Sequence, residues 1–184
     1  ENSDYLVRRE AASALAGMGL PPPAVGPVAT GRTGPVYAQI LSQTDRERVV
    51  EVVTTRGSFR IRLACPQAPL TCLSFLQLAG QGFFDGLTFH RVVPDFVVQT
   101  GDPRGDGWGG PGFALRDEIN RQRFGRGAVG MALSGPDTGG SQFFIALSPQ
   151  PHLDGGYTVF GQVAGDDSVL DQIRQEDELV TIRE

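Results

Sequence analysis

The sequence has 184 residues, of which 40% are hydrophobic and 20% are charged. This balance is typical of a soluble protein with one sizeable core and a smaller appendage. The net charge of −5 argues against a general phosphate-binding surface, so we expect no nucleic-acid partner. No apolar run approaches the roughly 20 residues of a membrane span. The first residue is Glu1 rather than Met, which predicts that the natural chain continues upstream. No signal peptide is visible, and the compartment stays open.

A helix is predicted within residues 2–19, where apolar residues recur on one face: Val7, Ala11, Ala14, Leu15 and Met18. The pattern VRREAASAL is similar to the second helix of a HEAT-like repeat, which would make residues 1–20 the last helix of a longer solenoid. Alternatively, the helix folds back on the domain that follows it. Either arrangement allows contacts through this N-terminal helix.

Residues 21–35 are rich in Pro and Gly and are expected to form an extended linker, so that residues 36–184 form the main domain. Residues 36–42 fit a short helix or a first strand. Residues 49–54 and 58–63 then predict a hairpin closed around Arg56-Gly57, with one buried face, and residues 70–81 predict a helix. Further strands are predicted at residues 128–133, 142–148, 158–163 and 179–182, and a short helix at residues 168–174.

The stretch from Phe89 to Asp102 reads FHRVVPDFVVQTGD. Bulky β-branched and aromatic residues on both sides of Pro94 predict a strand, a kink and a second strand. The glycine-rich residues that follow contain GxGxxG at Gly105, Gly107 and Gly110. A dinucleotide site would need a helix to open there, and the Pro-Gly pair at residues 111–112 opposes one, so we interpret this segment as a loop.

Catalysis by a nucleophile or a metal finds little support in the sequence. Ser141 and Cys72 are candidate nucleophiles and His90 and His152 are candidate bases, but their spacing specifies no triad and no zinc site. Cys65 and Cys72 match neither a metal motif nor a disulfide framework, and we interpret them as free structural thiols. We therefore expect no metal and no cofactor.

Three stretches together carry a resemblance: FHRVVPDFVVQTGD, GMALSGPDTGGSQFFIAL and HLDGGYTVFG. In this order they resemble the cyclophilin family of peptidyl-prolyl isomerases, from Arg48 to the C-terminus. The resemblance implies a mainly-β fold, a closed antiparallel eight-stranded barrel capped by two helices at residues 70–81 and 168–174. It also implies an enzyme that assists protein folding by rotating Xaa-Pro bonds, with proline-containing segments of client proteins as partners.

The resemblance assigns a role to each of thirteen residues. Arg91 resembles the catalytic arginine of the family, and Gln99 resembles the glutamine that positions it. Binding positions divide into a proline pocket, a backbone segment that pairs with the substrate, and a second pocket that reads the residues before proline. The pocket walls are Phe96, Phe144 and Leu153, with Val97 where the family commonly has Met; the backbone segment is Ala132, Leu133 and Ser134; the second pocket has Gln142 and Gly107.

The last two binding positions, His152 and Tyr157, depart from many family members. His152 stands where Trp is common, which puts cyclosporin sensitivity in doubt, and Tyr157 stands where many eukaryotic members have His. The combination resembles bacterial members. A second hypothesis is a binding module that holds proline segments without turnover, as part of a larger HEAT-like protein.

Overall fold

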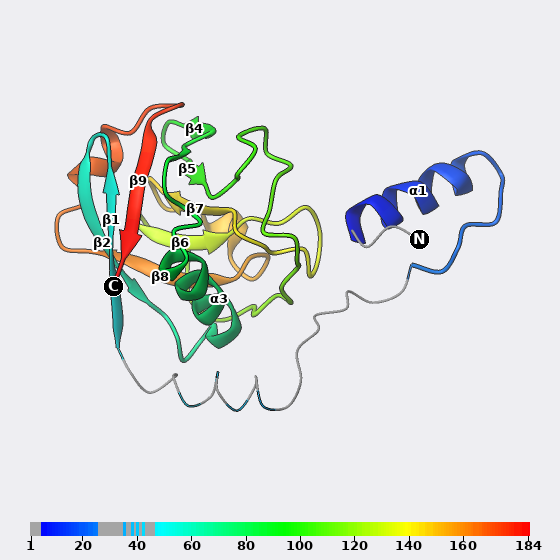
Figure 1. Cartoon of the computed structure of the whole chain (residues 1–184), viewed down its shortest axis with the longest axis horizontal. Helices are drawn as coiled ribbons and strands as arrows, with labels where there is room; N and C mark the ends of the chain where they lie inside the picture. The colour runs from blue at the N-terminus through cyan, green and yellow to red at the C-terminus, as the bar shows by residue number, and fades with distance from the viewer. Residues whose placement is uncertain (1–4, 26–34, 36–37, 39, 41, 43–46) are drawn as a thin grey trace.

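The computed structural model describes the chain except for residues 1–4, 26–34, 36–37, 39, 41 and 43–46. A curled sheet forms the body of the molecule, and the helix α1 (Tyr5–Gly17) lies to one side of it (Figure 1). Most of the predicted element at residues 36–42 falls outside the described residues. Among the described helices, none is both long enough and apolar enough to cross a membrane.

Nine strands form one antiparallel sheet within the described part of the chain, in the order β3-β9-β1-β2-β8-β6-β7-β5-β4. Their bounds are β1 (Arg48–Thr54), β2 (Gly57–Leu63), β3 (Leu87–Thr88), β4 (Arg91–Val93), β5 (Val97–Thr100), β6 (Ala128–Met131), β7 (Phe143–Ala146), β8 (Val159–Ala164) and β9 (Glu178–Arg183). The predicted hairpin is confirmed, because β1 pairs with β2 from Arg48↔Leu63 to Thr54↔Gly57.

The expectation of a closed eight-stranded barrel is wrong in its detail. The sheet has nine strands and two edges, β3 and β4, and it curls into a half-barrel without a closing ladder between them. The reason is that β3 and β4 are successive parts of one short segment, separated only by Phe89 and His90. The chain makes no turn at these two residues, unlike the turn at residues 55–56 between β1 and β2, so β3 and β4 continue one from the other and do not pair.

One α-helix of the main domain, α3 (Pro69–Gly80), confirms the helix predicted at residues 70–81. Pro69 occupies its first turn, where a missing amide hydrogen costs nothing. The second predicted helix, at residues 168–174, is shorter than expected. It is a 3₁₀ turn, η2 (Ser168–Asp171), since the chain leaves the helical conformation after Gln172 to enter β9.

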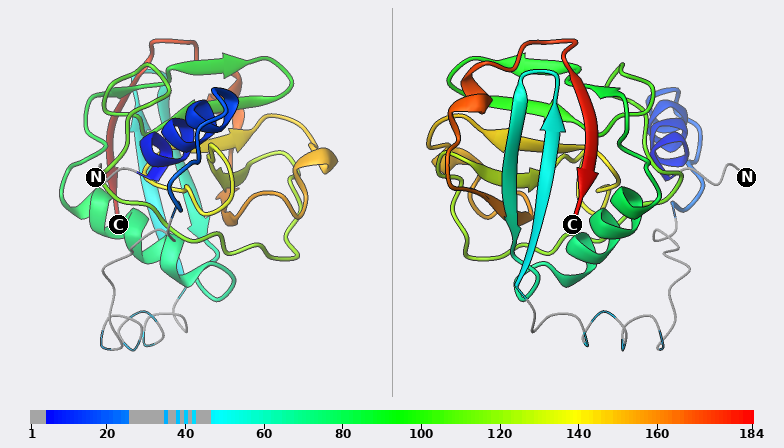
Figure 2. Two further views of the ribbon diagram at one scale, coloured as in Figure 1. Left: turned by 90° about the vertical axis from the view of Figure 1, so that its right-hand side faces the viewer. Right: turned by 60° about the vertical axis from the view of Figure 1, so that its left-hand side comes forward.

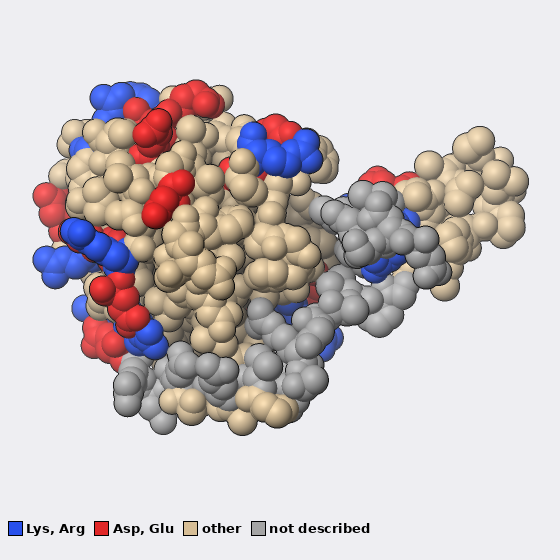
Figure 3. Space-filling model, viewed as in Figure 1, with Lys and Arg blue, Asp and Glu red and all other residues tan. Residues whose placement is uncertain are grey.

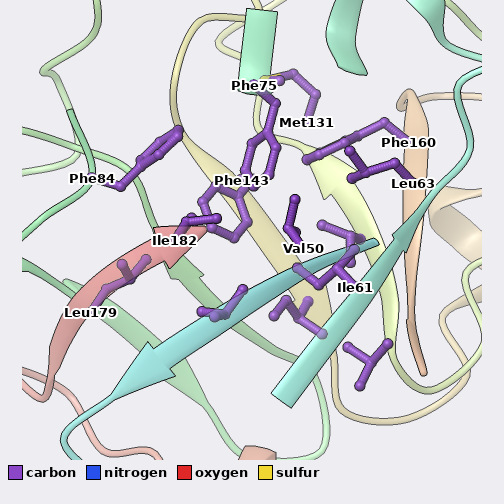
Figure 4. Close-up of a cluster of buried hydrophobic side chains, with 14 of the residues drawn as sticks. Val50, Ile61, Leu63, Phe75, Phe84, Met131, Phe143, Phe160, Leu179 and Ile182 are labelled. Carbon is purple, nitrogen blue, oxygen red and sulfur yellow. The ribbon is translucent and has the colours of Figure 1, made fainter. Parts of the chain in front are cut away.

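The core lies inside the curl of the sheet and is closed by α3. Phe75 of α3 points into it, with its ring 5.2–5.3 Å from those of Phe84, Phe143 and Phe160. Figure 4 shows these rings meeting the branched side chains of β1 and β2, among them Val50 and Ile61. Burial of these aromatic side chains is therefore what fixes α3 against the sheet.

Two contacts can be described between the helix α1 and the main domain. The Arg9 guanidinium donates a 3.0 Å hydrogen bond to the carbonyl oxygen of Ser134, and Ala12 is buried. Ala11, Ala14 and Met18 of the predicted apolar stripe are exposed, and the side chain of Val7 lies outside the described ones. The left view of Figure 2 shows α1 in front of the sheet. In Figure 3 charged side chains of both signs lie along the left side and the top of the main domain, and uncharged residues fill the centre of this face.

We predict that Phe75→Ala lowers the free energy of unfolding by about 3–5 kcal/mol, because it leaves a cavity among three aromatic rings. Val180→Ala is the control, since Val180 is 44% exposed and should cost less than about 1 kcal/mol. Urea denaturation followed by fluorescence measures both. Equal losses would show that Phe75 does not anchor α3.

We propose residues 1–20 as a helical extension, 21–35 as a linker and 36–184 as the folding unit. Removing residues 1–32 should then leave the urea midpoint of the remainder unchanged, because the described contacts of α1, the Arg9 hydrogen bond and the buried Ala12, contribute little. A comparison of midpoints and solution masses checks this. A lower midpoint or a smaller oligomer would mean that α1 stabilises the fold or an assembly.

Candidate active site

Arg91 and Gln99 lie side by side on the hairpin of β4 and β5. They are register partners, and the Arg91 guanidinium lies 3.4 Å from the Gln99 side-chain oxygen. The turn between the strands, residues 94–96, is held by Gln150, whose amide donates a 2.8 Å hydrogen bond to the carbonyl of Asp95. This turn places the Phe96 ring 5.4 Å from the guanidinium carbon of Arg91. The strand, kink and strand predicted around Pro94 are confirmed.

A chain of hydrogen bonds continues from Gln99 into the glycine-rich loop. The Gln99 amide nitrogen donates to the side-chain oxygen of Gln142 over 2.9 Å. The Gln142 amide nitrogen donates in turn to the carbonyls of Gly107 and Gly109, over 3.0 and 2.9 Å. Gln142 is therefore brought together with Arg91 and Gln99, and Gly107 marks where the loop meets this network.

The Asp102 carboxylate accepts hydrogen bonds from backbone amides of the glycine-rich loop and so holds the loop around itself. Asp102 was not predicted as a site residue. Burial alone would raise the pKa of this carboxyl, but hydrogen bonds from the amides of Arg104, Gly107 and Gly109 outweigh burial and hold the pKa below its usual value. A side chain at Gly109 would place its Cβ 1.9 Å from an Asp102 oxygen. The GxGxxG pattern thus serves a loop wrapped around a carboxylate, as expected for a loop and not for a dinucleotide site.

An apolar cluster lies beside Arg91, separate from the main core. It consists of six buried residues with three partly buried ones packed against them: Val97, Phe124, Ala128, Phe144, Leu153 and Val159, with Phe96, Ala132 and Tyr157. We call this set the second apolar cluster. It brings together all of the predicted walls of the proline pocket, and Val97, Ala132 and Tyr157 as well.

Phe124 and Gly130 shape this cluster, and neither was predicted. The rings of Phe124 and Phe144 stack at 5.3 Å with an interplanar angle of 24°, and Tyr157 meets Phe144 edge-on at 5.7 Å. A Cβ on Gly130 would lie 2.5 Å from Phe144 and 2.6 Å from Phe124. The available signal for Phe124 was its place as a lone aromatic residue among polar ones, which is typical of a side chain that finds a buried position.

The remaining predicted positions surround the cluster. His152, which is exposed, stacks on Phe96 with ring centroids 5.7 Å apart. The segment of Ala132, Leu133 and Ser134 follows β6, with the Leu133 side chain packed against the main core. Two backbone amides of this segment already donate hydrogen bonds within the protein. The Ala132 amide donates to the carbonyl of Gln142 over 3.0 Å, and the Ser134 amide donates to the Thr138 hydroxyl over 2.9 Å.

The candidate nucleophiles and bases do not assemble. Ser141 is buried, and its hydroxyl donates to the carbonyl of Gly101 over 2.6 Å. The Cys72 thiol is buried 3.5 Å from the carbonyl oxygen of Phe160. Burial lowers the pKa of His90, against the opposing effect of the Asp102 carboxylate, so the imidazole is neutral at neutral pH.

Comparison with known proteins agrees with this geometry. The family model for cyclophilin type peptidyl-prolyl cis-trans isomerases matches residues 49–183. The chain belongs to this family. A peptidyl-prolyl cis-trans isomerase of Synechococcus elongatus is 46% identical over 132 residues, which are 71% of this chain and 91% of that protein. One from Helicobacter pylori is 45% identical over 130 residues, 68% of this chain and 80% of that protein.

Solved structures show the same cyclophilin fold. A cyclophilin type isomerase of Cryptosporidium parvum superposes with a TM-score of 0.71 at 32% identity, covering 74% of this chain and 96% of that one. A second structure of that protein, determined in the presence of the dipeptide Ala-Pro, gives a TM-score of 0.70 at 32% identity, covering 73% of this chain and 97% of that one. The mainly-β cyclophilin fold is therefore confirmed, as a half-barrel with helices.

We predict that Gly130→Ala disturbs the second apolar cluster, because two rings occupy the space that the new methyl group needs. The variant should lose about 1–3 kcal/mol of stability and bind an Ala-Pro peptide more weakly. Gly125→Ala is the matched control, since nothing lies within 4 Å of a Cβ there. Thermal unfolding and peptide titration by NMR measure both effects. Identical behaviour of the two variants would contradict the assigned role of Gly130.

Proposed function

We propose that this cyclophilin catalyses rotation about Xaa-Pro peptide bonds in exposed segments of other polypeptides, with Arg91 as the catalytic residue. The observation that carries the proposal is the position of the Arg91 guanidinium, held by Gln99 at the edge of an apolar cluster. The Ala-Pro dipeptide used with the Cryptosporidium parvum structure supports the same class of ligand. A role in assisting the folding of client proteins follows from this activity.

The chemistry of the reaction explains why a fixed guanidinium beside an apolar cluster suffices. The barrier to rotation is about 18–20 kcal/mol and arises from amide resonance. The cis and trans forms differ by only about 0.5–1 kcal/mol before proline. A catalyst therefore needs to stabilise the twisted amide without favouring either end. No covalent intermediate, proton relay or metal is required for that.

We assign two parts of the site to this task. The second apolar cluster receives the proline ring, with Phe96, Phe144 and Leu153 as its walls. Arg91 donates to the amide as its resonance is lost, because a guanidinium stays charged and presents its donors in a rigid plane. Gln99 positions Arg91 through its side-chain oxygen.

The substrate backbone then follows the segment after β6. The amides of Ala132 and Ser134 are occupied by Gln142 and Thr138, so pairing would use the carbonyl groups of Ala132 and Leu133. Gln142 and Gly107 border the position of the residues before proline. His152 and Tyr157 line the rim on the other side of Phe96 and Phe144.

We expect Arg91→Ala to lower kcat for an Ala-Pro peptide by roughly a hundredfold and to weaken peptide binding far less, because the proposed contact strengthens in the transition state. Arg60→Ala is the control, since Arg60 is also an exposed arginine but lies on β2, outside the hairpin of β4 and β5. NMR exchange spectroscopy gives the cis/trans rate, and titration of the same peptide gives its affinity.

Two results would contradict this assignment. Full activity in Arg91→Ala would remove Arg91 from the mechanism while leaving the enzyme intact. Peptide binding by the unmodified protein, with exchange no faster than in buffer, would instead favour the binding module over the isomerase.

A further inference from the structure

Two cysteines that the proposed reaction does not use lie together at the junction of β2 and α3. Cys65 begins the turn that follows β2, and Cys72 lies in the first turn of α3. Both are buried free thiols. They line one small cavity, together with Ile40, Arg48 and Pro69. Their separation of seven positions gave no sign of this, because the turn at residues 65–67 folds the chain back so that both thiols face the same space.

The two thiols border the same cavity, and they differ in character. The hydrogen bond from Cys72 and, more weakly, the nearby Arg48 guanidinium lower the pKa of Cys65 to about 7, against the opposing effects of burial and of the Glu184 carboxylate. The same hydrogen bond and burial raise the pKa of Cys72. At neutral pH the pair therefore holds one proton on Cys72 and a substantial thiolate fraction on Cys65. Such a pair has a nucleophile and a resolving thiol within reach of each other.

We propose that Cys65 and Cys72 form a reversible dithiol–disulfide couple, a site of oxidation by small peroxides. The Cys65 thiolate attacks one peroxide oxygen, the O–O bond breaks, and a sulfenic acid and hydroxide result. Cys72 then attacks the Cys65 sulfur, its proton leaves with the second hydroxide as water, and the S–S bond forms. In sum, two thiols are oxidised to one disulfide and one hydrogen peroxide is reduced to two waters.

The local structure favours closure between these two cysteines over other outcomes. Six residues separate the two cysteines. Pro66 and Pro69 restrict the backbone of this segment, so the thiols are held near each other before oxidation. The start of α3 is fixed independently, because the amides of Leu70 and Thr71 donate to the Glu118 carboxylate over 2.9 and 2.8 Å. Oxidation of Cys65 also removes the hydrogen-bonded thiolate that raises the pKa of Cys72, which makes the second thiol easier to ionise.

The decisive experiment uses the full chain treated with hydrogen peroxide, with and without later dithiothreitol. Trypsin cleaves after Arg62 and Arg91 and releases both cysteines on one peptide, residues 63–91. We expect this peptide to become lighter by two hydrogen atoms and to resist iodoacetamide, and to recover both properties after reduction. Oxygen addition at Cys65 without a crosslink, or no reaction at all in the unmodified protein, would overturn the proposal.

The pH dependence of alkylation tests the coupling between the thiols separately. In the unmodified protein the rate at Cys65 should rise with a midpoint of about 7. Cys72→Ala removes the hydrogen-bond donor, so it should move this midpoint toward the ordinary thiol value of about 8.5 and should abolish the disulfide. Cys65→Ser should leave Cys72 unreactive at neutral pH. Equal reactivity of the two cysteines in the unmodified protein would show that they are independent packing residues.

Discussion

The site depends on the orientation of one side-chain amide, that of Gln142. Two backbone carbonyls of the glycine-rich loop can only accept hydrogen bonds, so they fix the nitrogen of Gln142 toward the loop and its oxygen toward Gln99. Gln99 must then turn its own nitrogen to Gln142 and its oxygen to Arg91. The loop carbonyls thus decide which atom donates and which accepts at each step, and as a result an oxygen of Gln99 faces the Arg91 guanidinium.

The choice of an amide partner for Arg91 has an electrostatic consequence. A carboxylate at Gln99 would hold the guanidinium more tightly, but it would also neutralise the charge that the twisted amide is proposed to meet. The amide oxygen positions Arg91 and leaves its charge available. Because Arg91 stays exposed, water solvates it in the free enzyme, and entry of an apolar proline ring beside it removes part of that water.

The alternation of buried and exposed side chains along a strand could be predicted from the sequence. The contacts that a strand makes with distant parts of the chain could not. Alternation supported the hairpin of β1 and β2, since one buried face leaves a local signature, and the β-branched and aromatic residues on both sides of Pro94 predicted the strands there. The sheet was predicted to be closed, but closure depends on which edges meet in space. Phe124 and Gly130 were missed for the same reason: their importance comes from a contact with Phe144, which no local pattern encodes.

Strand β7 shows how one element serves two purposes. Its successive side chains Phe143 and Phe144 point to opposite faces, Phe143 to the main core and Phe144 to the second apolar cluster. Phe143 packs against Phe75 of α3, so the helix and the proposed proline pocket lie on opposite faces of the same strand. The cysteine pair lies at the start of that helix, on the core side. A covalent link there constrains the junction of β2 and α3, whereas the Arg91 network is set from the glycine-rich loop, so oxidation would act on the stability of the fold and leave the geometry of Arg91 in place.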